Sequence, residues 1–138
     1  MNSKNIFLSF ATVVMLLFTA CNGGAQNTKQ QEATSSSAAM EVIQFHSENR
    51  CMTCNKIEEL TRETLKDFSD IPFSTVNVDD EKNEQKAAEF EAFGTALFLY
   101  NPKTGKKENL TEFAFMTAGN KEKFIQELKK KIASFQKL

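Results

Sequence analysis

The chain has 138 residues, of which 25% are charged and 41% hydrophobic, and its formal net charge is -1 at pH 7. This composition is ordinary for a globular protein and leaves room for one domain with a modest core. The near-neutral charge, with Glu122 and Glu127 mixed among the C-terminal lysines, argues against a nucleic-acid partner.

The first twenty residues have the pattern of an export signal. Lys4 precedes a mainly apolar run at 6–20, which is short for a membrane span of roughly 20 residues but typical of a signal-peptide core. The run ends in two small residues before Cys21, a pattern that resembles the lipobox of bacterial lipoproteins. We therefore expect residues 1–20 to be a lipoprotein signal peptide and Cys21 to carry lipid, with a plain secretory signal and an incidental cysteine as the alternative.

Residues 21–39 are expected to form a disordered tether. From Asn22 to Ala39 the sequence contains no apolar residue larger than alanine, so it cannot bury enough surface to offset the entropy of ordering. The remaining residues, 40–138, carry the periodic patterns of a folded domain.

The first part of this domain predicts a strand, a helix and a second strand. The apolar segment 40–45 is a short strand candidate, and a helix is expected from Cys51 onward. The apolar residues of this helix recur near helical spacing: Ile57, Leu60, Leu65 and Phe68. The segment 72–78 opens with proline and is rich in β-branched residues, which favours a strand.

The middle of the domain predicts a helix followed by a buried strand. The aspartate pair at 79–80 is expected to cap a helix over 81–93, which Gly94 would end. The next segment, 95–100, is nearly continuous in apolar residues, as a strand covered on both faces would be.

The last part predicts a hairpin and a long helix. A turn with Pro102 and Gly105 favours an edge strand at 107–110, and Asn120 is expected to cap the final helix. The segment 111–119 has no pattern that assigns it to a helix or a strand. Five phenylalanines are expected in the core: Phe90, Phe93, Phe98, Phe113 and Phe115.

This order of elements predicts a central sheet flanked by helices. Three segments then resemble the thioredoxin-like superfamily: CMTC (51–54) at the first strand-to-helix junction, TVNVDDEKN (75–83) and LFLYNPKTGKK (97–107). The resemblance covers 40–138 and implies a three-layer α/β sandwich with a central mixed sheet of about four strands. The segment 44–61, with the short domain and the lipoprotein signal, resembles more narrowly the bacterial nitrophenyl compound nitroreductase subunit ArsF family.

Cys51 and Cys54 are the main candidate site. A helix N-terminus stabilises a thiolate, and the preceding Arg50 offers a further cation. This favours Cys51 as the attacking thiol and Cys54, one turn along and more buried, as the resolving thiol. A permanent structural staple is the other interpretation, but so short a loop closes little chain entropy and would add little stability by that route.

A soft metal site is the runner-up interpretation. Thioredoxin-type proteins place a cis-proline before the third strand, whereas here Gly94 or Thr95 must occupy that corner. Without the proline, Cys51, Cys54 and His46 could form a pocket of two thiolates and one imidazole, which suits copper, zinc or arsenite.

The sequence therefore predicts a lipid-anchored thiol-disulfide oxidoreductase of the bacterial cell envelope, facing the periplasm. Its expected partners are the thiols or disulfides of an exported protein and a membrane reductant or oxidant. The alternative is a metal or metalloid carrier without catalytic turnover. No cofactor is expected, because the sequence has no G-x-G-x-x-G after a strand.

Overall fold

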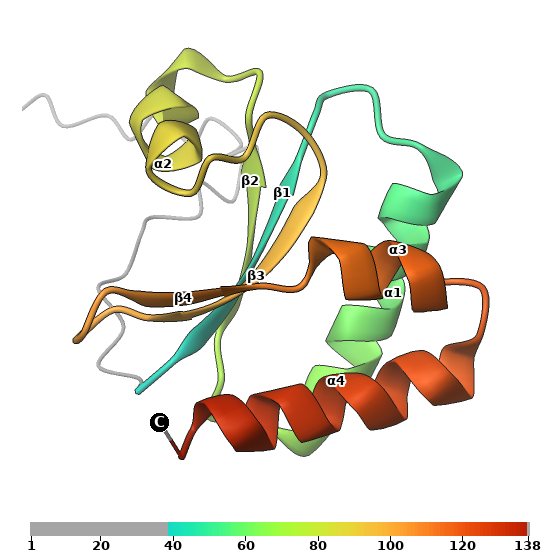
Figure 1. Cartoon of the computed structure of the whole chain (residues 1–138). Helices are drawn as coiled ribbons and strands as arrows, with labels where there is room; N and C mark the ends of the chain where they lie inside the picture. Colours follow the sequence, from blue (N-terminus) through green and yellow to red (C-terminus); the bar gives the residue numbers. More distant parts are fainter. Residues whose placement is uncertain (1–38, 138) are drawn as a thin grey trace, which may run out of the picture. The chain divides into compact units, whose positions relative to one another are not determined.

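The structure is a computed structural model, and it describes residues 39–137 (Figure 1). The predicted signal peptide, Cys21 and nearly all of the predicted tether lie outside these residues. Within 39–137, none of the helices combines the length and the apolar character that a membrane crossing requires.

Four strands form one mixed sheet in the order β2-β1-β3-β4. The strands are β1 (Glu41–His46), β2 (Phe73–Asn77), β3 (Ala96–Asn101) and β4 (Lys106–Asn109). β1 pairs in parallel with β2 and antiparallel with β3, and β4 pairs antiparallel with β3 at the edge. All four strands were expected from their apolar patterns and from the hairpin turn, and the predicted mixed sheet is confirmed.

Helices cover both faces of this sheet (Figure 1). They are α1 (Met52–Thr64), α2 (Glu84–Glu89), α3 (Thr111–Thr117) and α4 (Lys121–Phe135), with short 3-10 turns η1 (Leu65–Asp67) and η2 (Glu81–Asn83). α1, α3 and α4 lie on one face, whereas α2 lies on the other. The three-layer α/β architecture expected for a thioredoxin-like fold is therefore confirmed.

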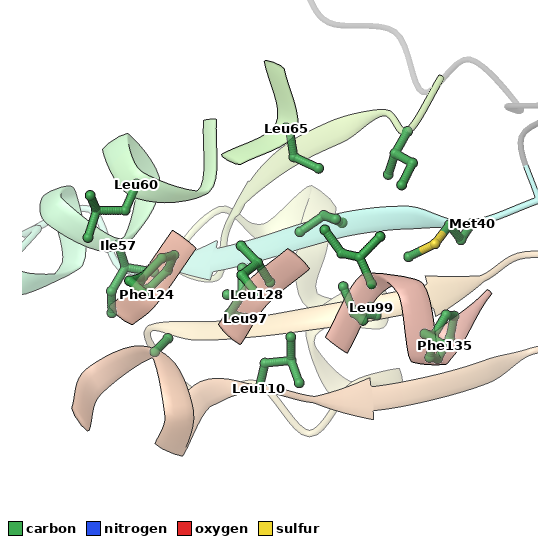
Figure 2. Close-up of a cluster of buried hydrophobic side chains, with 14 of the residues drawn as sticks. Met40, Ile57, Leu60, Leu65, Leu97, Leu99, Leu110, Phe124, Leu128 and Phe135 are labelled. Atoms are coloured by element: carbon green, nitrogen blue, oxygen red, sulfur yellow. The ribbon is translucent and has the colours of Figure 1, made fainter. Parts of the chain in front are cut away.

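The larger of two hydrophobic cores lies between the sheet and α1, α3 and α4 (Figure 2). Val42 of β1 and Leu97 and Leu99 of β3 face Phe124 and Leu128 of α4 there, and all five side chains are at most 1% exposed. Ile57 and Leu60 of α1 belong to the same core, so burial of apolar surface also holds α1 on this face of the sheet.

The smaller core is built from aromatic rings on the α2 face of the sheet. The ring of Phe45 lies with its centroid 5.2 Å from that of Phe90 and 5.8 Å from that of Phe98. Tyr100 adds an edge-on contact to Phe90 at 5.1 Å. Tilted and edge-to-face pairs of this kind stabilise the core beyond the area that they bury.

The prediction of one helix over 81–93 that ends at Gly94 is wrong. The segment begins with η2, continues as the six-residue α2 and leaves the helix at Phe90. Phe90 is 4% exposed and belongs to the aromatic core, so the chain turns toward the sheet at this point.

A residue with a left-handed backbone conformation ends α2. Glu91 has φ 52°, and its N–H donates to the carbonyl of Ala88 while the N–H of Ala92 donates to the carbonyl of Ala87. These two bonds form a Schellman motif, in which glycine is the usual residue at the left-handed position. Because glutamate stands there instead, the end of the helix carries no sequence signal.

The segment 111–119, which has no pattern that predicts a helix or a strand, contains α3. The side chain of Asn109 accepts a hydrogen bond from the N–H of Thr111 at 2.9 Å, at the point where the helix starts. The predicted cap of α4 is confirmed, since the side chain of Asn120 accepts from the N–H of Lys123 at 3.0 Å.

Candidate functional site

Cys51 and Cys54 form a disulfide at the start of α1, with their Cα atoms 5.1 Å apart. The short loop 47–50 carries the chain from the end of β1 to this position (Figure 1). Packing of Ile57 and Leu60 in the helix-side core fixes the direction of α1. The sheet and the core thus place the cysteine pair at the carboxyl end of a central strand.

Cys51 is the N-cap residue of α1 and is exposed to solvent. Its sulfur accepts a hydrogen bond from the backbone N–H of Cys54 at 3.0 Å, the role that an oxygen of serine or aspartate usually fills. The first turn of α1 has no acidic residue that would offset the positive end of the helix dipole. Both features stabilise negative charge on this sulfur once the disulfide is opened.

Cys54 differs from Cys51 in its surroundings. Its side chain is on the inner side of the helix and the residue is only 5% exposed. Its backbone carbonyl accepts a hydrogen bond at 3.0 Å from the side-chain amide of Gln44, a fully buried residue of β1. The pair therefore combines one exposed cysteine with one that the domain shields.

Arg50 does not extend freely into solvent beside Cys51. Its guanidinium lies 2.5 Å from the carboxylate of Glu58, which also binds Arg62 at 2.8 Å. Partial burial alone would raise the pKa of Glu58, but the hydrogen bonds and charges of the two arginines outweigh it and hold that pKa below its usual value. The predicted tuning by Arg50 therefore depends on Glu58, which partly neutralises it.

Two substitutions in this ion pair should change the reactivity of Cys51 in opposite directions. Glu58→Gln removes the anion that balances Arg50, so it should raise the alkylation rate of reduced Cys51 at pH 7 by about two- to fivefold. Arg50→Gln should lower the rate by a similar factor. The alkylation rate of Cys51 is measured in chains that also carry Cys21→Ser and Cys54→Ser, so that Cys51 is the one remaining thiol. A change of this rate in the same direction in both variants would contradict the electrostatic account.

His46 and Thr95 lie at the same end of the sheet. The Nδ1 atom of His46 hydrogen-bonds to the carbonyl of Ser47 at 3.0 Å, and His46 is half-buried where β1 ends. Thr95 stands directly before β3, and an added Cβ at the neighbouring Gly94 would lie 3.9 Å from the hydroxyl of Ser47. The corner that thioredoxin-type proteins fill with proline thus adjoins the loop that leads to Cys51.

The structure gives the metal alternative no added support. Between residues 39 and 137, no group of three histidine, cysteine, aspartate or glutamate side chains is placed to hold a metal ion. In this oxidised state the two sulfurs are bonded to each other. A site made from Cys51, Cys54 and His46 stays a prediction for the reduced protein.

Several large apolar side chains are exposed on α1, on α3 and in the loop before β3. The large hydrophobic residues that are exposed within 39–137 are Met52 at 90%, Phe93 at 90%, Met116 at 77% and Phe115 at 42%. Met52 lies between the two cysteines, Phe93 precedes the corner at Thr95, and α3 carries the other two. We call these four residues the apolar rim.

An open groove of about 490 Å³ runs along part of this rim. Its walls come from α1 and from α3 with the turn after it, and they are formed by Met52, Thr53, Lys56, Phe115, Ala118 and Gly119. An exposed apolar surface next to a reactive group is characteristic of a binding site.

The core assignment of the phenylalanines was right for Phe90 and Phe98, and Phe113 is partly buried, but it was wrong for Phe93 and Phe115. The signal for Phe115 lies in its neighbours, since Leu110, Ala114, Thr117 and Ala118 are buried at helical spacing. This pattern predicts a short helix whose opposite face, with Phe115 and Met116, is exposed. Phe93 has no comparable signal, because it lies in the irregular loop after α2.

No protein-family model and no curated protein matches this chain. Among solved structures, the chain is similar to thioredoxin of Fasciola hepatica, with 22% identity and a TM-score of 0.42 over 51% of this chain and 64% of that one. It is also similar to thioredoxin f2 of Chlamydomonas reinhardtii, with 16% identity and a TM-score of 0.45 over 64% of this chain and 82% of that one. The chain thus spans slightly less than two thirds of the Fasciola hepatica protein.

Proposed function

We propose that this protein is a thiol-disulfide oxidoreductase of the bacterial cell envelope that exchanges disulfides with exported proteins through Cys51 and Cys54. The observation that carries the proposal is the disulfide at the N-terminus of α1, which joins the exposed residue Cys51 to the buried residue Cys54. This asymmetry gives the two cysteines different roles in one reaction.

In the reducing direction the Cys51 thiolate attacks a disulfide of the partner. A bond forms between Cys51 and one partner sulfur, and the other partner sulfur leaves as a thiolate. Cys54 then loses its proton and attacks the Cys51 sulfur, which closes the Cys51–Cys54 disulfide and releases the first partner sulfur. Two electrons pass to the partner, whose two sulfurs become thiols, and the same steps in reverse oxidise a partner dithiol.

The apolar rim supports a protein as the partner. An unfolded or extended segment next to the partner's cysteine would bury Met52, Phe93 and Met116, whereas a small thiol such as glutathione would not. A membrane reductant or oxidant would then restore the starting state of the pair.

The location is part of the proposal. A lipid on Cys21 would anchor the chain, and residues 21–39 would let the domain reach partners near the membrane surface. The narrower association with the ArsF family rests on the sequence around the cysteines and on the lipoprotein-like signal. It implies no nitroreductase chemistry, since the sequence offers no flavin or nicotinamide motif.

Removing two members of the rim should slow exchange with proteins selectively. In Phe93→Ser/Met116→Ser we expect the rate with a denatured, disulfide-containing protein to fall about tenfold, which corresponds to about 1.4 kcal/mol of lost transition-state binding. The rate with glutathione should stay unchanged, because neither side chain belongs to the cysteine pair.

Lys103→Ser is the matched control, since Lys103 is exposed in the hairpin turn at the opposite end of β3. It should leave both rates unchanged. Equal losses with the protein and with glutathione in the double variant would show that the rim affects the chemistry and does not bind the partner.

A further inference from the structure

Gln44 is a polar residue in the most buried strand of the domain. It is 0% exposed, and its neighbours Ile43 and Phe45 are equally buried. In the register of the sheet it lies between Thr75 of β2 and Leu97 of β3. A buried amide at this position is unfavourable unless its polar atoms find partners.

Only one end of the Gln44 amide has a partner. The carbonyl of Cys54 can only accept a hydrogen bond, so the atom 3.0 Å away must be the amide nitrogen of Gln44. The amide oxygen is buried, and it has no hydrogen-bond partner among residues 39–137. The backbone of Cys54 thus holds the amide in place while the amide oxygen stays unpaired in the disulfide form.

The missing donor can come from the same cysteine. In the disulfide, the sulfur of Cys54 carries no hydrogen and cannot donate. The Cys54 side chain is shielded from solvent, and the buried Gln44 amide is bound to the backbone of the same residue. Reduction therefore creates a shielded S–H group on the residue whose carbonyl holds the Gln44 amide, and the oxygen of this amide is a buried acceptor without a partner among residues 39–137.

We propose that the amide oxygen of Gln44 accepts a hydrogen bond from the Cys54 thiol in the reduced protein, so that Gln44 is a positioning residue of the redox pair. Two thiols of glutathione supply two electrons and become a glutathione disulfide, while the Cys51–Cys54 S–S bond breaks. One of their protons binds the Cys54 sulfur, and Cys51 stays a thiolate or takes the second proton. The inference rests on the redox activity proposed above for the pair.

This hydrogen bond has two consequences for the exchange reaction. It stabilises the reduced form relative to the disulfide, so it makes the pair a stronger oxidant. It also keeps the proton on Cys54 and leaves Cys51 as the thiolate that attacks. A neutral amide oxygen is too weak a base to remove the proton, so Gln44 orients the resolving thiol but does not activate it.

The reduction potential tests the first consequence. In Gln44→Met, which keeps the length of the side chain but removes the acceptor, the equilibrium constant for reduction by glutathione should fall about two- to fivefold. This corresponds to a potential lower by about 10 to 20 mV for a two-electron couple. An unchanged or higher potential would overturn the proposal.

Thr61→Val is the matched control. Thr61 is also fully buried on α1 and its hydroxyl also has no hydrogen-bond partner among the described residues, but it lies two helical turns beyond Cys54. Its substitution should leave the potential unchanged. A shift equal to that of Gln44→Met would show a general effect of core polarity and would overturn the proposal.

Infrared spectroscopy tests the bond directly, even if Gln44→Met does not fold. In the full-length chain with Cys21→Ser and Cys51→Ser, Cys54 is the one remaining thiol, because the sequence has three cysteines. We expect its S–H stretching band at a lower frequency than that of a free thiol, and a band at the free-thiol position would overturn the proposal. This readout needs no disulfide exchange, so it separates failure of the inference from failure of the proposed function.

Discussion

Cys54→Ser is expected to trap partner proteins on Cys51 as stable mixed disulfides, whereas Cys51→Ser should trap none. Cys51 is exposed and its sulfur receives the backbone N–H of Cys54, so it can form the first bond to a partner. The shielded Cys54 supplies the second thiol, and without it the mixed disulfide cannot be resolved. Both substitutions should lower the multiple-turnover rate of disulfide exchange to that of the uncatalysed reaction.

Non-reducing gel electrophoresis of envelope fractions measures the trapped complexes, and reduction should release them. The double variant Cys51→Ser/Cys54→Ser controls for disulfides made by Cys21. Equal trapping by the two single variants would show that the assigned roles are wrong.

Phe45→Ala is expected to lower the free energy of unfolding by about 3 to 5 kcal/mol. Phe45 is 0% exposed and its ring contacts both Phe90 and Phe98, so its removal leaves a cavity in the aromatic core. The total free energy of unfolding of a domain of this size is usually only about 5 to 15 kcal/mol. The urea concentration at the midpoint of denaturation should therefore fall strongly.

Phe93→Ala is the control for this substitution, because it removes the same side chain from a position that is 90% exposed. It should change the free energy of unfolding by less than about 0.5 kcal/mol. Similar losses in the two variants would contradict the assignment of Phe45 to the core and Phe93 to the apolar rim.

Local patterns were sufficient to predict the order of strands and the two longest helices. β3 was expected from an uninterrupted apolar run, and the start of α4 from Asn120, whose side chain does cap the helix. The position of the cysteine pair followed from the same local signals, because it lies where the pattern of β1 gives way to that of α1. Each of these features depends on residues close together in the sequence.

The errors occur where contacts between distant residues decide the structure. α2 ends early because Phe90 packs against Phe45 and Phe98 on the face of the sheet. Glu91 then takes a left-handed backbone conformation, which the presence of a glutamate does not predict. The exposure of Phe93 and Phe115 depends on which faces the other elements cover, which a composition rule for phenylalanine cannot reveal. The contact between Gln44 and Cys54 likewise joins residues of different elements.

The site combines features that favour a thiolate with one that limits it. The N-terminus of α1 and the N–H of Cys54 stabilise negative charge on Cys51, while Glu58 holds the nearest arginine in an ion pair. The proposed bond from Cys54 to Gln44 would set the protonation of the second thiol. The redox behaviour of the pair should therefore depend on residues of both α1 and β1.

The measurement that tests the central claim most directly is the reduction potential of the Cys51–Cys54 pair. The full-length chain with Cys21→Ser, in detergent, is equilibrated with glutathione buffers, and metal content is determined on the same sample. We predict a reversible two-electron transition between about -120 and -270 mV without stoichiometric metal. A metal-loaded pair that glutathione does not titrate, or a disulfide that it cannot open, would contradict a thiol-disulfide oxidoreductase.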